Sequence, residues 1–165
     1  AHKCVMLCGD SKAAVTDTRK TLPGMRALQK YAVTAGGGKN HRFNLSDGAM
    51  IKDNHIDAYG GIIPAVTALR EKIGHMVKIE VEVRNKDELM QAIEAGADVI
   101  MLDNMSCAEM AECVKLTDGR AKLEASGNIN IDTVAAAAAT GVDIISVGAI
   151  THSVKAFDIS LKIRK

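Results

Sequence analysis

The stretch Ala95-Gly96-Ala97-Asp98-Val99-Ile100 recurs as Thr140-Gly141-Val142-Asp143-Ile144-Ile145, and this repeat decides the fold. In each copy a glycine stands where a helix can end, and β-branched residues that favour a strand follow it. The repeat therefore marks the passage from a helix into a strand. Strands that alternate with single helices predict a parallel sheet with right-handed crossovers.

Further strands and helices extend this pattern over the chain. Strands are predicted over residues 14–18, 49–52, 78–83, 98–103, 121–126 and 143–148. Helices are predicted over residues 23–34 and 64–73, and behind the capping residues Asn85, Ser106 and Asn130. The near-constant spacing of six strands predicts an α/β fold, an incomplete (β/α) TIM-like barrel with mostly parallel strands.

Polar and apolar residues alternate along two of the predicted strands, 78–83 and 122–126. Each strand therefore has one apolar face and one charged face. In a barrel the apolar faces pack on the helices and the charged faces point into the lumen, where burial is costly without partners. An internal layer of ion pairs is expected there, made by Lys78, Glu80, Lys122 and Glu124. A half-solvated antiparallel sheet is the alternative.

Composition narrows the classes of function. The chain has 165 residues, a formal net charge of +1 and 2% aromatic residues, so a nucleic-acid-binding surface is not expected. The sequence has no apolar run long enough to span a membrane and no signal-like start, so it indicates neither membrane insertion nor export. Four cysteines without a metal-binding or secreted pattern predict reduced thiols and a cytoplasmic protein, with zinc ligation as the alternative.

Cations cluster in the first third of this nearly neutral chain, at Arg19-Lys20, His41-Arg42 and Lys52. Arginine offers a planar fork to a carboxylate, and lysine a mobile charge to a phosphate. The cluster predicts a site for a small ligand with several carboxylates or phosphates. Solvated turns with basic residues are the alternative to such a site. The three glycines at 36–38, just before His41-Arg42, could also be a plain linker. His55 is expected to be structural.

Polar residues and glycines follow the later strands, at the barrel rim where active sites are assembled. Ser126-Gly127-Asn128 and Gly148-Ala149-Ile150-Thr151-His152 each open toward a helix, an arrangement typical of phosphate binding by backbone N–H groups. Ordinary turns would also use glycine here. Glu82 and Asp103 could hold sugar hydroxyls directly or through Mg²⁺, or could be structural partners of nearby lysines.

Several strings in this order resemble quinolinate phosphoribosyltransferase: DTRKTLPGMRALQKYAV, GGGKNHRFNLSDGAMIKDNHI, EVEVRN, IMLDNM, LEASGNI and GVDIISVGAITHSVKAFDISLKI. The resemblance covers the chain from about Val15 to Ile163. It implies transfer of phosphoribose from phosphoribosyl pyrophosphate to the ring nitrogen of quinolinate. Loss of the 2-carboxylate as CO₂ would give nicotinate mononucleotide on the route to NAD.

The resemblance also implies a role for each matching residue. The quinolinate carboxylates would be held by Arg19, His41, Arg42 and Lys52. Catalysis would depend on Lys20, which reaches phosphate, and on Glu82 and Asp103, which bind the ribose hydroxyls with Mg²⁺ nearby. The 5-phosphate would be bound by Ser126, Gly127, Asn128, Gly148, Ala149 and His152.

Family members carry an N-terminal α/β domain that covers the partner subunit's barrel mouth and contributes an arginine. Residues 1–165 are expected to be the barrel domain alone, and by themselves to turn over quinolinate at a small fraction of the rate of a chain that bears the extra domain. The resemblance implies a homo-oligomer of at least two subunits. Two rival functions stay open. One is a related barrel that acts on another pyridine carboxylate or serves metal-oxyanion transport; the other is a non-catalytic binder of phosphorylated sugars.

Overall fold

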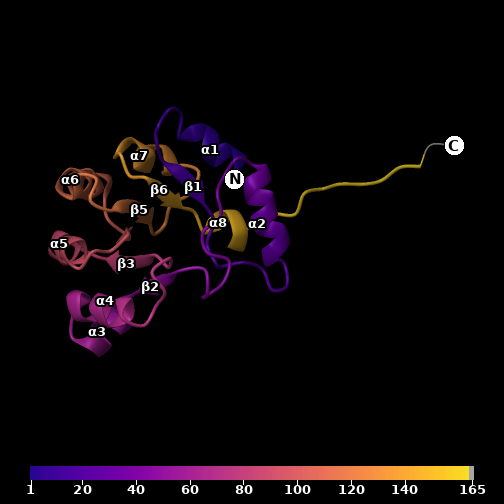
Figure 1. Ribbon diagram of the computed structural model, residues 1–165. Helices are drawn as coiled ribbons and strands as arrows, with labels where there is room; N and C mark the ends of the chain where they lie inside the picture. The colour runs from indigo at the N-terminus through magenta and orange to yellow at the C-terminus, as the bar shows by residue number, and fades with distance from the viewer. Residues whose placement is uncertain (164–165) are drawn as a thin grey trace.

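A single parallel sheet organises the molecule. The computed structural model describes residues 1–163 and is shown in Figure 1. The strands are β1 (Ala14–Thr16), β2 (Ala49–Ile51), β3 (Ile79–Val83), β4 (Val99–Asp103), β5 (Lys122–Ser126) and β6 (Ile144–Ser146). Their order is β1-β6-β5-β4-β3-β2, and every neighbouring pair is parallel. Within the described residues β1 and β2 form the two edges, so the predicted incomplete barrel is confirmed.

At least one helix follows each of the six strands, and one more precedes β1. The helices are α1 (His2–Leu7), α2 (Arg26–Ala35), α3 (Asp53–Tyr59), α4 (Ile62–Arg70), α5 (Lys86–Glu94), α6 (Cys107–Thr117), α7 (Val134–Ala139) and α8 (Ala149–His152). The predicted caps of two helices are confirmed. The Asn85 side chain accepts the Glu88 N–H at 2.9 Å, and Ser106 and Glu109 form a reciprocal capping box.

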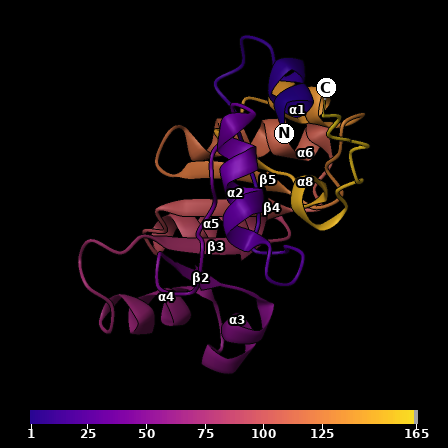
Figure 2. The same ribbon diagram turned by 90° about the vertical axis from the view of Figure 1, so that its right-hand side faces the viewer.

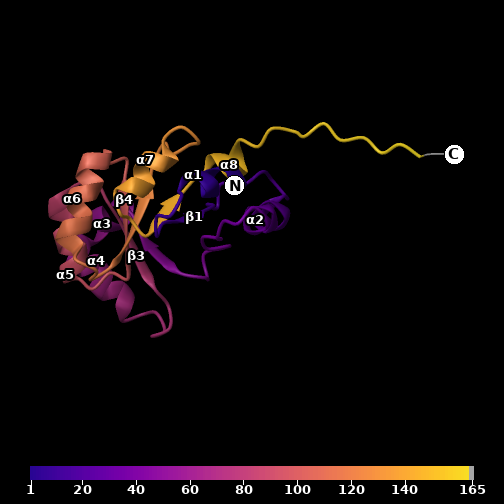
Figure 3. The ribbon, with the colours of Figure 1, turned by 90° about the horizontal axis from the view of Figure 1, so that it is seen from above.

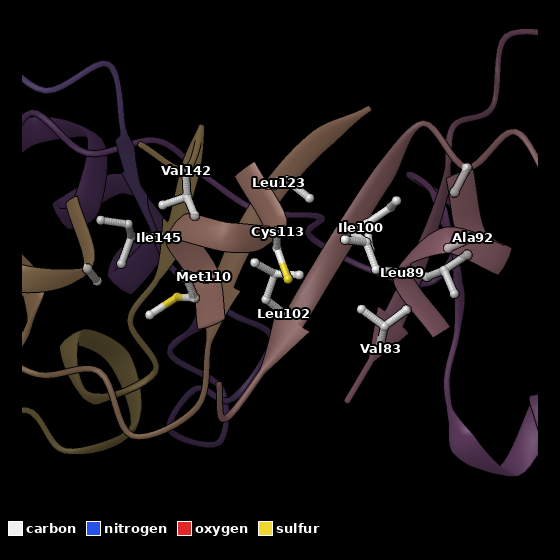
Figure 4. Close-up of a cluster of buried hydrophobic side chains, with 14 of the residues drawn as sticks. Val83, Leu89, Ala92, Ile100, Leu102, Met110, Cys113, Leu123, Val142 and Ile145 are labelled. Carbon is white, nitrogen blue, oxygen red and sulfur yellow. The ribbon is translucent and has the colours of Figure 1, made fainter. Parts of the chain in front are cut away.

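The hydrophobic core lies between the sheet and one layer of helices. The apolar face of β3, made by Ile79, Val81 and Val83, is completely buried. Leu89 and Ala92 of α5 and Cys113 of α6 are equally buried, and Figure 4 shows their side chains directed at the strands. This layer of small aliphatic residues confirms that the apolar strand faces pack on helices.

The opposite face of the sheet is covered by other elements. Figure 3 shows α2 and α8 on the far side of the sheet from α4, α5 and α6. In Figure 2 the helix α2 lies across the strands on this face. After its C-terminus the chain returns to the sheet, where Lys39 forms a parallel bridge with Thr16 of β1. The helix and the segment that follows it therefore lie over the concave, polar face.

The starts of two predicted helices need correction. The helix expected behind Asn130 begins at Val134, with Thr133 as its N-cap residue. The helix expected from Pro23 begins at Arg26, because residues 22–25 form a turn closed by the Met25 N–H on the Leu22 carbonyl at 3.0 Å. Gly24 has φ of +72°, and proline followed by such a glycine is typical of a type II turn. The helix α3 was not predicted. His55 Nδ1 accepts the Lys52 N–H at 3.0 Å at its start, a contact that fits the structural role expected for His55.

The last part of the chain leaves the sheet. Figure 1 shows the segment after α8 running away from the folded body in an extended conformation. Four of its apolar side chains are almost fully exposed: Phe157, Ile159, Leu161 and Ile163. The four cysteines are free, with Cys4, Cys8 and Cys113 buried and Cys107 exposed. Among the described helices, none is long and apolar enough to cross a membrane.

Candidate active site

The predicted rim residues meet at the carboxyl ends of adjacent strands. Asp103, the last residue of β4, stands opposite Ser126, the last residue of β5. Glu82 lies near the end of β3, beside Met101 of β4. Because all six strands are parallel, these side chains share one edge of the sheet with the loops that follow β1, β2 and β6. The structure therefore brings the predicted residues to one end of the molecule.

Asn104 connects two parts of this rim and was not predicted from the sequence as a site residue. Its side-chain nitrogen donates to Asp103 at 2.9 Å, and its side-chain oxygen accepts from Asn128 at 3.1 Å. Its own N–H donates to the Ser126 carbonyl at 2.9 Å. A Cβ at Gly127 would overlap the Asn104 side chain, so this loop requires glycine. The only sequence signal was an asparagine directly after a strand.

The loop after β6 meets the loop after β1. The Thr151 hydroxyl donates to the Lys20 carbonyl at 2.7 Å, which joins the predicted phosphate loop to the Arg19-Lys20 segment. Gly148 and Ala149 are half-buried and His152 is exposed. A Cβ at Gly148 would come within 2.9 Å of His152 Nε2, so the histidine ring packs closely over the glycine. Phosphate binding by these residues stays a prediction.

Arg42 of the predicted cluster is held by neighbours from its own loop and from β2. Its guanidinium donates to the Gly48 carbonyl at 3.0 Å and contacts the Met50 sulfur at 3.3 Å. Burial and the positive charge of Arg19 lower the pKa of Arg42, while Glu80 opposes this change. The two guanidinium groups therefore repel one another, and an anion bound between them would relieve that repulsion.

Lys52 and Glu82 form an ion pair across the rim. Lys52 follows β2 and Glu82 lies on β3, so the pair joins the predicted carboxylate-binding and ribose-binding groups. Lysine pairing was the structural alternative for Glu82, and the structure contains that contact. The Lys52 side chain is still 44% exposed, so its ammonium group remains accessible to a ligand.

The expected layer of ion pairs inside the barrel has a different composition. Lys78 and Lys122 are exposed, and Lys122 donates to Asp143 at 3.0 Å. Glu80 and Glu124 are buried, and their partner is His41, whose Nε2 lies 3.2 Å and 3.4 Å from their carboxylates. The prediction of a lysine partner was wrong because both lysines lie at the amino ends of their strands.

The electrostatics of this triad favour a charged imidazole. Burial alone would lower the pKa of His41, but hydrogen bonds and charges from Glu124 and Glu80 raise it to about 10. Burial also raises the pKa of Glu80. The Arg42 N–H lies 2.8 Å from His41 Nδ1, so protonation of Nδ1 requires a small shift of this contact. Nε2 faces the two glutamates, and a role of His41 in holding substrate stays a prediction.

Two sets of residues could bind a cation. His41, Glu80 and Glu124 are the one group of three potential ligands within the described chain, with ligand atoms no more than 4.8 Å apart. Glu82 and Asp103, the predicted Mg²⁺ residues, offer the oxygen atoms that Mg²⁺ prefers. One oxygen of Glu82 meets Lys52 and one oxygen of Asp103 meets Asn104. Their remaining oxygens suit indirect contact through water or sugar hydroxyls.

Comparison with known proteins places the chain in a family. The family model described as "Quinolinate phosphoribosyl transferase, C-terminal domain" matches residues 1–162. A probable nicotinate-nucleotide pyrophosphorylase [carboxylating] of Bacillus subtilis is 51% identical over 98% of the chain and 56% of its own length. The corresponding chloroplastic protein of Arabidopsis thaliana is 44% identical over 93% of the chain and 49% of its own length.

Solved structures agree. NadC from Streptococcus pyogenes has a TM-score of 0.93 and 43% identity, over 98% of this chain and 56% of that one. The nicotinate-nucleotide pyrophosphorylase from Francisella tularensis has a TM-score of 0.93 and 50% identity, over 96% and 56%. The chain thus spans about half the length of the relatives it matches. It belongs to the quinolinate phosphoribosyltransferase family and corresponds to the C-terminal domain of that family.

Proposed function

We propose that the protein transfers phosphoribose from phosphoribosyl pyrophosphate to quinolinate, with release of pyrophosphate and CO₂ and formation of nicotinate mononucleotide. One observation carries this proposal. A cluster of cationic groups and a rim of carboxylates share the carboxyl end of one parallel sheet. Such a site can neutralise a dicarboxylate and a pyrophosphate while it stabilises positive charge on a sugar. Family membership and the names of the relatives support the same reaction.

The carboxylates of quinolinate would be bound by the cations that follow β1, the Lys39 bridge and β2. These are Arg19, His41, Arg42 and Lys52. The positive charges of Arg19 and Arg42 repel one another, and a bound carboxylate would remove that repulsion. The ring nitrogen would then be held in line with the anomeric carbon of the sugar.

Phosphoribosyl pyrophosphate would occupy the rim. Lys20 would contact the pyrophosphate, and Glu82 and Asp103 the ribose hydroxyls. The 5-phosphate would meet the backbone N–H groups of the loops that contain Ser126, Gly127, Asn128, Gly148, Ala149 and His152. Mg²⁺ bound near Glu82 and Asp103 would neutralise the charge of the leaving pyrophosphate.

The reaction breaks the bond from the anomeric carbon to the pyrophosphate oxygen, and the ring nitrogen supplies the electron pair of the new C–N bond. The sugar passes through a cationic state that the carboxylates of Glu82 and Asp103 stabilise. The bond to the 2-carboxylate then breaks, CO₂ leaves, and the cationic ring accepts the electron pair. A proton from solvent replaces the carboxylate on the ring.

The test is an assay dependent on phosphoribosyl pyrophosphate, with quinolinate, nicotinate and nicotinamide as alternative substrates for the full natural protein. The expected result is release of CO₂ and pyrophosphate with quinolinate, and no turnover with nicotinate or nicotinamide. Turnover of another pyridine carboxylate would indicate the related barrel, and binding of the phosphosugar without turnover would indicate a non-catalytic binder.

We further propose a homo-oligomer of at least two subunits that acts in the cytosol. The family resemblance supports the oligomer, because it implies a partner's domain over the barrel mouth. Four free cysteines are consistent with a reducing compartment. The mass of the natural protein in solution tests the first point.

A further inference from the structure

Helix α2 turns polar side chains toward the site. Gln29 and Lys30 are buried within it, with exposed fractions of 9% and 1%, and Arg26 lies one turn before Lys30. A buried lysine is costly unless its charge is paired and its hydrogen bonds are made. The contacts of this polar face therefore reveal what α2 contributes besides packing.

Lys30 holds the backbone of His41. Its ammonium group pairs with Asp17, and both side chains are almost completely buried. The same ammonium donates to the His41 carbonyl at 2.9 Å, and the His41 N–H donates to Asp17 Oδ1 at 2.9 Å. With the Asn40 amide turned to satisfy its neighbours, its nitrogen donates to Asp17 Oδ2 at 2.6 Å. The residue that precedes Arg42 is thus fixed at both of its peptide groups.

Gln29 holds the other side of the site. Its side-chain nitrogen donates to the Thr151 carbonyl at 2.8 Å, and its side-chain oxygen accepts the Leu22 N–H at 3.0 Å. Thr151 belongs to the predicted phosphate loop, and Leu22 lies in the segment that carries Lys20. One buried amide therefore joins these two loops.

Arg26 adds a third connection. Its guanidinium donates to the Arg19 carbonyl at 3.0 Å and to the Phe43 carbonyl at 3.3 Å. These partners lie on the two segments that carry the predicted quinolinate-binding arginines. Most contacts of the polar face of α2 thus go to backbone atoms of loops that carry site residues.

We propose that Gln29 and Lys30 are positioning residues, Gln29 for the phosphate loop and Lys30 for the His41-Arg42 loop. This inference rests on the proposed function, because it assigns one ligand to each loop. Catalytic groups need placement to within about 0.5 Å, and buried hydrogen bonds to the backbone supply that precision. Both residues also contact the segment after β1, but of the two Gln29 alone contacts Thr151 and Lys30 alone contacts His41, so their replacement should affect different substrates.

Gln29→Glu tests the first half in the full natural protein. The carboxylate can still accept the Leu22 N–H, but it has no donor for the Thr151 carbonyl. A carboxylate oxygen and the Thr151 carbonyl oxygen, both acceptors, then face one another. We expect KM for phosphoribosyl pyrophosphate to rise about tenfold while KM for quinolinate stays within about twofold. Gln91→Glu, at an exposed position of α5, is the matched control and should leave both values unchanged.

The second half requires a paired substitution. Lys30→Met alone would leave Asp17 buried without a counter-charge and could unfold the protein. The double variant Asp17→Asn with Lys30→Met removes both charges together. We expect KM for quinolinate to rise about tenfold with little change for phosphoribosyl pyrophosphate. Lys115→Met on the exposed face of α6 is the control.

The pattern of the two KM values decides the result. Opposite selectivity of the two variants supports the proposal. Equal changes in both KM values, or unchanged values in folded variants, would overturn it. Calorimetric titration with each substrate gives the same comparison without turnover. Failure of the wild-type protein to use quinolinate would instead overturn the proposed function, while the titrations still report the effect of each variant on each ligand.

Discussion

Substitution of Arg42, whose side chain is half-buried, tests the predicted carboxylate pocket. Arg42→Ala should weaken quinolinate binding by roughly 2–5 kcal/mol, because it removes a charge-assisted fork from a desolvated carboxylate. Phosphoribosyl pyrophosphate binding should change little. Arg42→Lys should restore little, since an ammonium group cannot form the planar fork. Isothermal titration calorimetry measures both ligands, and unchanged quinolinate affinity in Arg42→Ala would contradict the assignment.

The raised pKa of His41 predicts that the stability of the fold depends on pH. Its folded-state pKa of about 10 lies above the ordinary histidine value of 6.5. The stability it contributes is therefore present below the unfolded pKa and is lost as pH rises toward the folded value. The raised pKa of Glu80 acts in the same direction at lower pH. The groups that face His41 are Glu80, Glu124 and Arg42.

Glu124→Gln should remove one of the two carboxylates and lower the pKa of His41. The fall in unfolding free energy between about pH 6.5 and pH 10 should then become shallower than in the wild-type protein. NMR titration of the His41 ring measures the pKa, and denaturant unfolding at several pH values measures the stability. Glu94→Gln, at an exposed position of α5, is the control. An unchanged His41 titration would exclude coupling to Glu124.

Residue types could be predicted better than residue partners. Arg19, Arg42 and Lys52 were selected from sequence because a cation cluster in a neutral chain is visible without a fold. The contact of His41 with Glu80 and Glu124 was missed, because three distant segments come together only in the folded sheet. Lys30 was missed because a lysine on an amphipathic helix normally faces solvent.

At the scale of secondary-structure elements, the repeated aspartates tie neighbouring strands together. Asp98 accepts the Ile79 N–H at 2.8 Å, and Asp143 accepts the Leu123 N–H at 3.0 Å. Each carboxylate therefore binds the start of the adjacent strand. Burial alone would raise the pKa of Asp143, but hydrogen bonds from Leu123, Lys122 and Lys12 lower it. The repeat seen in the sequence thus has a structural cause.

Asp143→Ala should lower the free energy of unfolding by about 1–3 kcal/mol at pH 7, because the Leu123 N–H loses its acceptor. A lowered folded-state pKa means that this stability is present above the unfolded value and disappears as pH falls through the folded one. The difference from wild type should therefore shrink below about pH 4. Urea unfolding at pH 7 and below about pH 4 measures the difference in unfolding free energy, with the exposed Asp132→Ala variant as control. An equal loss at both pH values would contradict the charged hydrogen bond.

Elements with local signals were predicted, and those set by tertiary contacts were not. The capped helices α5 and α6 and all six strands follow from residues within each segment. Helix α3 was missed because its sequence, Asp53–Tyr59, has few apolar positions and no buried residue. The start of α2 was misplaced because Pro23 fits both a turn and the first turn of a helix.

The whole molecule leaves several apolar surfaces accessible. A groove of about 530 Å³ runs along the edge strand β2 and α4, lined by residues that include Met50, Ile51, Leu69 and Ile73. The segment after α8 also alternates apolar and polar residues. Its apolar positions Phe157, Ile159, Leu161 and Ile163 are 86%, 83%, 93% and 89% exposed. Extended segments of this pattern and unpaired sheet edges are both prone to association.

We therefore expect residues 1–165 to self-associate as concentration rises, and Ile159→Ser with Leu161→Ser to shift the chain toward the monomer. These two side chains are almost fully exposed, so their replacement should leave the melting temperature unchanged. Sedimentation velocity at several concentrations measures the shift. Asp158→Ser with Lys162→Ser alters the polar face of the same segment and should not reduce association. If the apolar pair left sedimentation unchanged while the polar pair abolished association, charge would drive self-association and the alternating pattern would have no part in it.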